Sequence, residues 1–360
     1  MHQLRIPGPT PCPPEVLKAI GRQMINHRGK EFAQIMRDIT PKLQQVFQTK
    51  NDVFILTGSG TGGMEAAVVN TLSPGDKVLA ASCGNFGDRF AEIAEIFGAE
   101  VKRLNFEWGK PVDPDAVRQA LKADSGIKAV LVTQNETSTG VTNDLKSITA
   151  VAKEFDKLIL VDAISGLGSI DLPVDAWHCD VVITASQKGW MVPPGLAMVS
   201  VSEKAWQAYA KAKMPRYYWD FKLAKDYLEK GQTPATPAVS VFFGLAVALD
   251  MMLAEGLSKV FARHAKIAGI ARNGAKSMGL SILPEEKYAS NTVSAIKASD
   301  KLNVSKLLKL LEDEHGVVLA GGQGILSGKI FRIGHLGWVT EKDIKEVMDA
   351  IAEVIPQASS

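Results

Sequence analysis

A lysine near the middle of the chain stands where a catalytic nucleophile could be held. Lys188 comes shortly after the apolar run Val181–Ala185 and directly before a glycine. A lysine in a low-polarity pocket with cationic neighbours has a lowered pKa, and its free amine can form an imine with a carbonyl compound. Most lysines are solvated surface groups, so this chemistry needs support from other residues.

A carboxylate ends the preceding apolar run. Asp162 closes the segment Leu158–Asp162, and the four residues before it are all apolar. Burial makes a lone charge costly unless a cation or a strong donor meets it. A protonated pyridine nitrogen would be such a partner, and keeping that nitrogen protonated makes a pyridoxal ring an electron sink. An aspartate that merely caps the turn at residues 163–166 is the structural alternative.

A glycine-rich loop adds a candidate phosphate site. Residues 57–63, Thr-Gly-Ser-Gly-Thr-Gly-Gly, follow an apolar run and open a helical pattern. Flexible glycines, hydroxyls and free N–H groups at a helix start are suited to bind phosphate. The loop lacks the ending of a P-loop, and residues 80–83 lack the acidic residue that a dinucleotide fold would require there. A tight turn without a ligand remains the alternative.

An arginine in the last third of the chain could bind the substrate. Arg332 ends the run 329–331, which is expected to be a strand. A guanidinium is suited to a bidentate grip on the α-carboxylate that amino acids and 2-oxo acids share. A structural salt bridge is the alternative for Arg332, and His335 is expected to be a packed or surface residue rather than a catalyst.

The elements that must position these residues alternate along the first 200 residues. Strands are expected at residues 53–57, 77–81, 101–104, 129–133, 158–162, 181–185 and 196–201, with amphipathic helices between them at 62–72, 86–97, 114–123 and 145–155. This alternation predicts an α/β fold with a mainly parallel, seven-stranded sheet. Ligands of such sheets bind at the carboxyl ends of the strands.

The rest of the chain has a different pattern. An aromatic and basic stretch at 215–221 and a Thr/Pro segment at 232–237 precede a helical pattern at 239–257. We expect a large domain over residues 18–256 and a smaller α+β domain over 257–360, with strands near 292–296 and 330–333. Prolines rule out a helix before Pro14, so residues 1–17 should form an extended arm. Both a frayed end and a segment across a site entrance fit this arm.

Composition limits the partners. The 41 basic and 39 acidic residues are spread along the chain, without the long basic block of a nucleic-acid or membrane binder. Three cysteines without CxxC spacing indicate neither a disulfide framework nor a zinc site. There is no leader-like apolar segment, no uninterrupted run of about 18 apolar residues, and no peroxisomal Ser-Lys-Leu ending. We expect a cytoplasmic protein with small-molecule substrates.

Several segments together resemble the class V aminotransferases, in particular their alanine–glyoxylate and serine–pyruvate or serine–glyoxylate group. The resemblance is carried by Asp162, Ala-Ser-Gln-Lys at 185–188 and Pro-Pro-Gly at 193–195, and in family order also by residues 7–9, 58–61, 136–141 and 331–334. It spans nearly the whole chain. It implies the fold type I of enzymes that depend on pyridoxal 5'-phosphate, with the cofactor held by Lys188 as a Schiff base.

The resemblance also implies roles for individual residues. The cofactor site would consist of Ser59, Gly60, Thr61 and Gln187 at the phosphate, Phe86 and Ile164 on the two faces of the ring, Thr137 near its phenolic oxygen, and Asp162 at its nitrogen. Arg332 and Gly8 would contact the substrate. Thr236 would reach the phosphate of the neighbouring subunit in a homodimer, whereas Thr233 stands where some relatives carry tyrosine.

The predicted reaction is ping-pong transamination from alanine or serine to glyoxylate or pyruvate. Aspartate or another amino acid remains open as the donor. Desulfurases and related lyases share the scaffold but typically carry a histidine before the lysine and a late reactive cysteine. Here Gln187 precedes Lys188, and no cysteine follows Cys179. A nicotinamide dehydrogenase and a non-catalytic binding protein are further alternatives.

Overall fold

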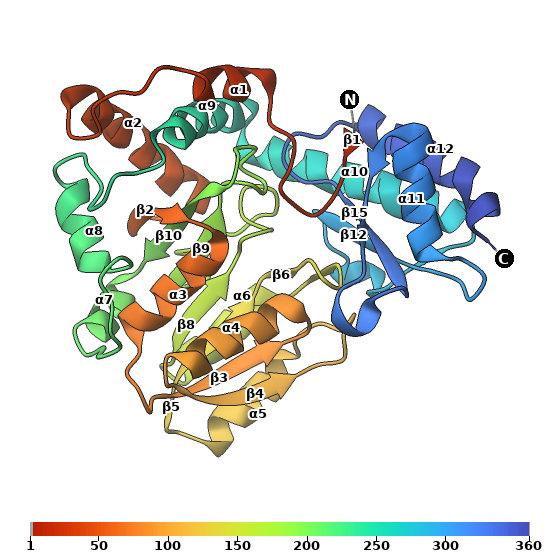
Figure 1. The fold of residues 1–360 in the computed structure, drawn as a ribbon. Helices are drawn as coiled ribbons and strands as arrows, with labels where there is room; N and C mark the ends of the chain where they lie inside the picture. The colour runs from red at the N-terminus through yellow and green to blue at the C-terminus, as the bar shows by residue number, and fades with distance from the viewer. Residues whose placement is uncertain (1–2, 360) are drawn as a thin grey trace.

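A seven-stranded sheet forms the centre of the molecule. The computed structural model describes residues 3–359; residues 1, 2 and 360, which belong to the predicted arm and small domain, lie outside them. The strand order is β2 (Asp52–Gly58), β10 (Gly195–Val201), β9 (Val181–Ala185), β8 (Leu158–Asp162), β5 (Ile127–Thr133), β3 (Lys77–Ser82) and β4 (Glu100–Asn105). Only β10 runs antiparallel to its neighbours. The predicted mainly parallel sheet is confirmed (Figure 1).

Helices cover both faces of this sheet. One face packs against α3 (Gly60–Thr71), α4 (Asn85–Ile96), α7 (Glu203–Tyr209) and α8 (Phe221–Leu228). The other packs against α1 (Pro14–Ile20), α2 (Lys30–Phe47), α5 (Pro114–Ala123), α6 (Leu145–Glu154) and α9 (Val239–Glu255). Successive residues of a strand point to opposite faces, and Val53 and Ile55 accordingly join one apolar cluster while Phe54 joins the other. Burial on both faces explains the continuous apolar runs.

A smaller sheet follows in the C-terminal part. Its order is β11 (Ser281–Ile282), β12 (Val293–Lys297), β15 (Ile330–Gly334) and β14 (Ala320–Gly321), and α10 (Leu257–Ser277), α11 (Val304–His315) and α12 (Glu341–Ala358) contribute to its core. Short elements complete the chain: β6 (Asn135–Glu136), β7 (Val141–Thr142), η1 (Glu286–Tyr288), β13 (Val317–Val318) and η2 (Gly324–Leu326). Both strands expected in this region are present.

Two helix bounds differ from the predictions by two residues, and the other predicted helix bounds differ by at most one residue. Helix α3 starts at Gly60 rather than residue 62, because the first glycines of the loop already belong to its first turn. Helix α9 ends at Glu255 rather than residue 257, because Gly256 has a φ of 87° and breaks the helix. Helices α9 and α10 meet there at 87°. The proposed boundary between the large and small domains lies at this bend.

The N-terminal arm connects the small sheet with the loop that carries Lys188. Strand β1 (Gln3–Leu4) pairs with β13, and the carbonyl of Arg5 accepts a hydrogen bond from the Gly334 N–H at 2.6 Å. Further along, the N–H of Thr10 donates to the Gln187 carbonyl at 3.1 Å. In Figure 1 the arm is the dark red segment that runs from β1 past β15 to α1. The structure therefore favours an arm that crosses the site over a frayed end. As predicted, no helix precedes Pro14 within residues 3–359, but α1 begins there, so residues 14–17 of the predicted extended arm are helical.

Within residues 3–359, no single helix is both long and apolar enough to cross a membrane. Helices α9 and α10 would meet the length and composition only as a pair bent by 87°.

Candidate active site

Most of the predicted cofactor-binding residues gather at one edge of the large sheet. Asp162 ends β8, Lys188 follows β9, and the glycine loop follows β2. Phe86 lies in α4 after β3, and Thr137 follows β5 and β6. Strands β2, β3, β5, β8 and β9 run parallel in the large sheet, so their carboxyl ends meet at the same edge. The site thus arises from the strand order, with residues far apart in sequence.

Lys188 lies against the N-terminal arm. Its Nζ donates a hydrogen bond to the carbonyl of Pro7 at 2.5 Å. Gly8 has a φ of 125°, and a β-carbon there would lie 2.5 Å from Nζ, so only glycine fits at this position. The pKa of Lys188 is lowered to about 8: burial lowers it most, Asp162 raises it, and Arg332 and Arg89 lower it. Lys188 therefore has much more free amine near neutral pH than a surface lysine has.

Asp162 is a buried acid without an ion pair. Its side chain is 3% exposed, and Oδ1 accepts a hydrogen bond from the Ile164 N–H at 2.9 Å. Burial raises its pKa to about 7, although Lys188 partly offsets this. Among the described residues, no basic side chain lies within 4.0 Å of its carboxylate oxygens. A cationic group on a ligand would stabilise the ionised carboxylate in this buried position, and a protonated pyridine nitrogen is such a group.

The start of α3 leaves N–H groups free. Ser59 precedes the helix, its side chain makes no capping hydrogen bond, and the first turn holds no acidic residue. These N–H groups and the helix dipole favour an anion. Ile164 packs beside the loop, since a β-carbon at Gly60 would lie 2.5 Å from its Cδ1. The loop, Ile164 and Asp162 are therefore parts of one site.

Arg89 adds a positive charge that was not predicted. Its Nη1 donates to the Thr61 hydroxyl at 3.4 Å, and its guanidinium lies 4.9 Å from the centre of the Phe86 ring. The position is one helical turn after Phe86, and residues three apart share a helix face. That spacing was a signal in the sequence that could have pointed to Arg89.

Gln187 has an unsatisfied polar atom. Its Oε1 is buried and has no hydrogen-bond partner among the described residues. Buried polar atoms are normally paired, so this amide fits a site that binds a further group. Together with the unpaired Asp162 and the uncapped start of α3, it shows that the residues present suit pyridoxal phosphate.

Glu136 was also missed as an organising residue. The side chain is fully buried, and its Oε2 accepts hydrogen bonds from the N–H groups of Phe86 and Gly87 at 3.0 and 3.1 Å. Its Oε1 accepts from the hydroxyl and the N–H of Ser138 at 2.6 and 3.1 Å. Burial raises the pKa of Glu136, and these donors lower it. The carboxylate thus joins the start of α4, which carries Phe86, to the loop that carries Thr137.

Arg332 reaches from β15 to that same loop. It is 5% exposed; Nε donates to the Gly321 carbonyl at 2.9 Å, and Nη1 donates to the Thr137 carbonyl at 3.0 Å. Neither bond uses Nη2. Burial lowers the pKa of Arg332, and Glu136 raises it. His335 is fully buried, with Nε2 2.9 Å from the Ser294 hydroxyl, so it is a packed residue.

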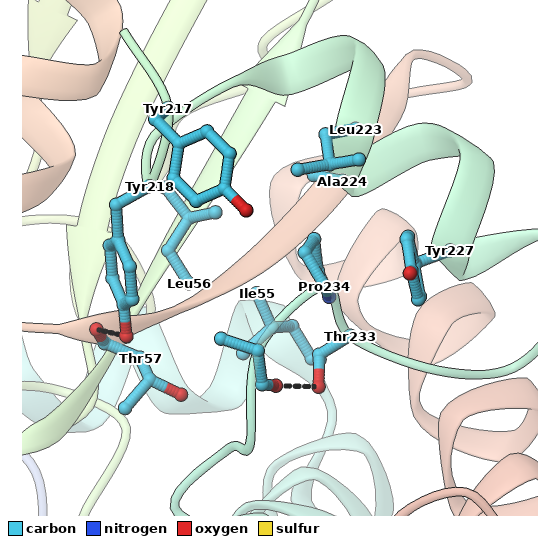
Figure 2. Close-up of a pocket in the computed structure, with 11 residues that line it drawn as sticks. Ile55, Leu56, Thr57, Tyr217, Tyr218, Leu223, Ala224, Tyr227, Thr233 and Pro234 are labelled. Atoms are coloured by element: carbon cyan, nitrogen blue, oxygen red, sulfur yellow. Dashed lines mark hydrogen bonds between the residues drawn. The ribbon is translucent and has the colours of Figure 1, made fainter.

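Thr233 lines a cavity of about 160 Å³ (Figure 2), and Thr236 follows three residues later on the same loop. Thr233 is buried, and its hydroxyl donates to the carbonyl of Ala235 at 2.8 Å. Arg28 holds the same loop through the carbonyls of Thr233 and Pro234. Thr236 is exposed and makes no side-chain hydrogen bond within residues 3–359. The structure therefore places Thr236 where a second chain could meet it.

Comparison with known proteins identifies the family. The sequence model described as Aminotransferase class-V matches residues 4–341. The chain is 44% identical to the soluble hydrogenase 42 kDa subunit of Anabaena cylindrica, over 98% of this chain and 92% of that protein. It is 39% identical to the L-aspartate–glyoxylate aminotransferase of Paracoccus denitrificans, over 93% of this chain and 86% of that protein.

Solved structures agree with the sequence comparison. The crystal structure of an alanine–glyoxylate aminotransferase from Nostoc sp. superposes with a TM-score of 0.95 and 29% identity, covering 98% of this chain and 95% of that one. The predicted fold type I is thereby confirmed. The chain belongs to the class V aminotransferases, a family of enzymes that depend on pyridoxal phosphate.

Proposed function

We propose that this enzyme transfers the amino group of a small amino acid, alanine or serine, to glyoxylate or pyruvate by a ping-pong mechanism. The observation that carries the proposal is Asp162, a buried acid without an ion pair at the same sheet edge as Lys188. Glyoxylate appears in the names of the relatives from Paracoccus and Methylorubrum and of the Nostoc structure.

The chain offers a partner for each part of the cofactor. Ser59, Gly60 and Thr61 would hold the phosphate with Gln187. Phe86 and Ile164 would enclose the ring, with Thr137 near its phenolic oxygen and Asp162 at its nitrogen. When bound, the cofactor supplies the electron sink for the pair left behind as a proton leaves the substrate's α-carbon.

Lys188 has the properties of the residue that moves this proton. With a pKa of about 8, its Nζ exists partly as the free amine near neutral pH and can both take up and return a proton. The Pro7 carbonyl, 2.5 Å from Nζ, orients this nitrogen. Because the barrier depends on the position of the base, the arm contributes to the proton transfer through orientation.

Arg332 would bind the substrate carboxylate. Two of its nitrogens are fixed by the carbonyls of Gly321 and Thr137, so the guanidinium is held in one orientation. The close approach of Gly8 to Lys188 leaves little room beside the amine. This crowding supports a small amino donor rather than a bulky one.

The site is proposed to be shared between two subunits. Thr233 lines the cavity of Figure 2, and Thr236 is exposed on the same loop; the lining also includes Tyr217 and Tyr218. These side chains are 84% and 50% exposed, which is unusual for large aromatic residues. A second copy of the chain would cover this face and bring its Thr236 to the phosphate.

Rates of the two half-reactions test the substrate proposal. Pyridoxal-phosphate enzyme is mixed with each amino acid, and the pyridoxamine form with each 2-oxo acid, while the cofactor absorbance is followed. Alanine or serine should be the fastest donor, with glyoxylate or pyruvate as the fastest acceptor, and Lys188→Ala should abolish both half-reactions. Dominant turnover of aspartate and 2-oxoglutarate would contradict the proposed substrates.

The name of the Anabaena relative refers to a hydrogenase subunit. Among residues 3–359, no group of three or more His, Cys, Asp or Glu side chains is arranged to hold a metal ion. The proposal rests on the site geometry and on the aminotransferase relatives.

A further inference from the structure

Trp219 lies against two glycines of the phosphate-binding loop. A β-carbon at Gly58 would lie 2.8 Å from the Cη2 atom of its indole, and one at Gly62 would lie 2.7 Å from the same atom. Carbon atoms in contact are normally about 3.5 to 4.0 Å apart. Neither glycine has a positive φ, so it is the indole, rather than the backbone conformation, that leaves no room for a side chain there.

The backbone around Trp219 is bound to helix α3. Asn70 of α3 is fully buried; its Nδ2 donates to the Trp219 carbonyl at 2.6 Å, and its Oδ1 accepts from the Phe221 N–H at 3.0 Å. Arg216 adds a hydrogen bond from Nη1 to the Val69 carbonyl at 3.2 Å. The segment that carries the indole is thus fixed to the helix whose first turn forms the phosphate-binding loop.

Tyr218 supports the other end of the loop. Its hydroxyl donates to the carbonyl of Thr57, the residue before Gly58, at 3.3 Å (Figure 2). Its ring meets the Trp219 ring edge-on, with 4.8 Å between the ring centres. The aromatic residues Tyr218 and Trp219 therefore contact the loop at three points: Thr57, Gly58 and Gly62.

We propose that Trp219, supported by Tyr218, is a positioning residue that holds the phosphate-binding loop in its binding geometry. The inference rests on the proposed binding of pyridoxal phosphate at this loop. The loop needs such support, because Ser59 is exposed and no side chain caps α3. Donors that are already in place bind an anion more tightly than donors that must first be ordered.

Comparison of two ligands tests this role. Pyridoxal phosphate uses the loop, whereas pyridoxal lacks the phosphate and serves as the probe that does not. In Trp219→Ala, the Kd of pyridoxal phosphate should rise by about 10- to 100-fold, the size of loss that follows when residues supporting the ligands of a metal site are replaced, while the Kd of pyridoxal should stay close to that of the wild type. Absorbance titration of the cofactor-free protein gives both constants, and the oligomeric state is measured alongside.

The variant Gly62→Ala tests the same contact by changing the loop instead of the indole. It keeps the indole but places a methyl group where the ring packs, and the same selective loss is expected. Alanine is a better helix former than glycine by about 1 kcal/mol, so helix propensity would act in the opposite direction. In the double variant Trp219→Ala/Gly62→Ala the methyl group has room, and the two losses should not add.

Two control variants lie away from the loop. Gly269→Ala changes a glycine of α10 that has no atom within 4 Å of an added β-carbon. Trp177→Ala removes a partly buried indole that precedes β9, at the end of that strand opposite to Lys188. Both should leave the ratio of the two Kd values unchanged.

The outcomes separate this inference from the proposed function. Trp219 has no positioning role if Trp219→Ala and Gly62→Ala keep the wild-type ratio of the Kd of pyridoxal phosphate to the Kd of pyridoxal. That ratio is also kept if both variants bind the two ligands more weakly by the same factor. If Trp219→Ala does not fold, Trp219→Phe and Gly62→Ala decide the question by the same ratio. A wild-type protein that binds neither ligand would overturn the proposed function and this inference with it.

Discussion

Asp162 is a charged residue in a place where burial opposes its charge. Its pKa is raised from 3.8 to about 7 in the folded chain. The folded state therefore holds this proton more tightly than the unfolded state does. Stability falls as the pH rises from about 4 to about 7, because the carboxyl must ionise while buried. At neutral pH the cofactor-free protein is therefore less stable than it would be without this acid. Such a loss of stability is expected where a residue is placed for function.

Asp162→Asn should stabilise the cofactor-free protein above pH 7. The amide keeps an acceptor for the Ile164 N–H and carries no charge. Since one pKa unit corresponds to about 1.4 kcal/mol, we expect a gain of about 2 to 4 kcal/mol in the free energy of unfolding. Urea unfolding above pH 7 and near pH 4 measures it, and the gain should vanish at the lower pH.

The same substitution should remove most of the transaminase activity. Asparagine cannot keep a pyridine nitrogen protonated, so the electron sink is weakened. Asp180→Asn is a matched control, because Asp180 is also buried with a raised pKa but lies directly before β9, at the opposite edge of the sheet from Lys188. It should leave the cofactor spectrum unchanged. An Asp162→Asn enzyme of wild-type rate would refute the role assigned to this carboxylate.

The N-terminal arm is the element that places Gly8 directly against the side chain of Lys188. At Gly8, both the φ of 125° and the contact with Lys188 exclude a β-carbon. Gly8→Ala should therefore displace the arm or the lysine and reduce kcat by about 100-fold, since a shift of about 1 Å at a reacting group can cost that much. Steady-state kinetics measures this loss.

Gly75→Ala separates backbone strain from the contact with the lysine. Gly75 has a φ of 82° but no atom within 4 Å of an added β-carbon. It should lower the thermal stability slightly and leave kcat unchanged. Equal losses of kcat in the two variants would show that the close approach of Gly8 to Lys188 does not matter for catalysis.

The strands and their ends could be predicted from the sequence, whereas contacts between distant segments could not. Asp162 ends one buried apolar run and Lys188 follows another, and the parallel sheet then fixes both at one edge. Pro7 lies 181 residues before Lys188, and a proline-rich arm has no periodicity that reveals where it packs. Glu136 finds its donors 49 and 50 residues away on α4. Only tertiary structure brings such groups together.

At the scale of the whole molecule, the proposed shared site needs two subunits. If Thr236 serves the neighbouring site, a dimer of one Lys188→Ala and one Thr236→Val subunit contains one complete site. That site combines Lys188 of the second subunit with Thr236 of the first. Differently tagged subunits are co-expressed, and the mixed dimer should bind pyridoxal phosphate tightly at half of its sites. If Thr236 acts within its own subunit, the mixed dimer has no complete site and its affinity matches that of the Thr236→Val homodimer.

Mass spectrometry of the borohydride-treated enzyme tests the central claim most directly. Purified protein is saturated with pyridoxal phosphate, reduced and digested, and the peptide that carries the added mass is sequenced. The account predicts one modified residue, Lys188, loss of the visible absorbance band on reduction, and no such adduct in folded Lys188→Ala. Attachment at another lysine, or a colourless protein that gains no mass, would contradict it.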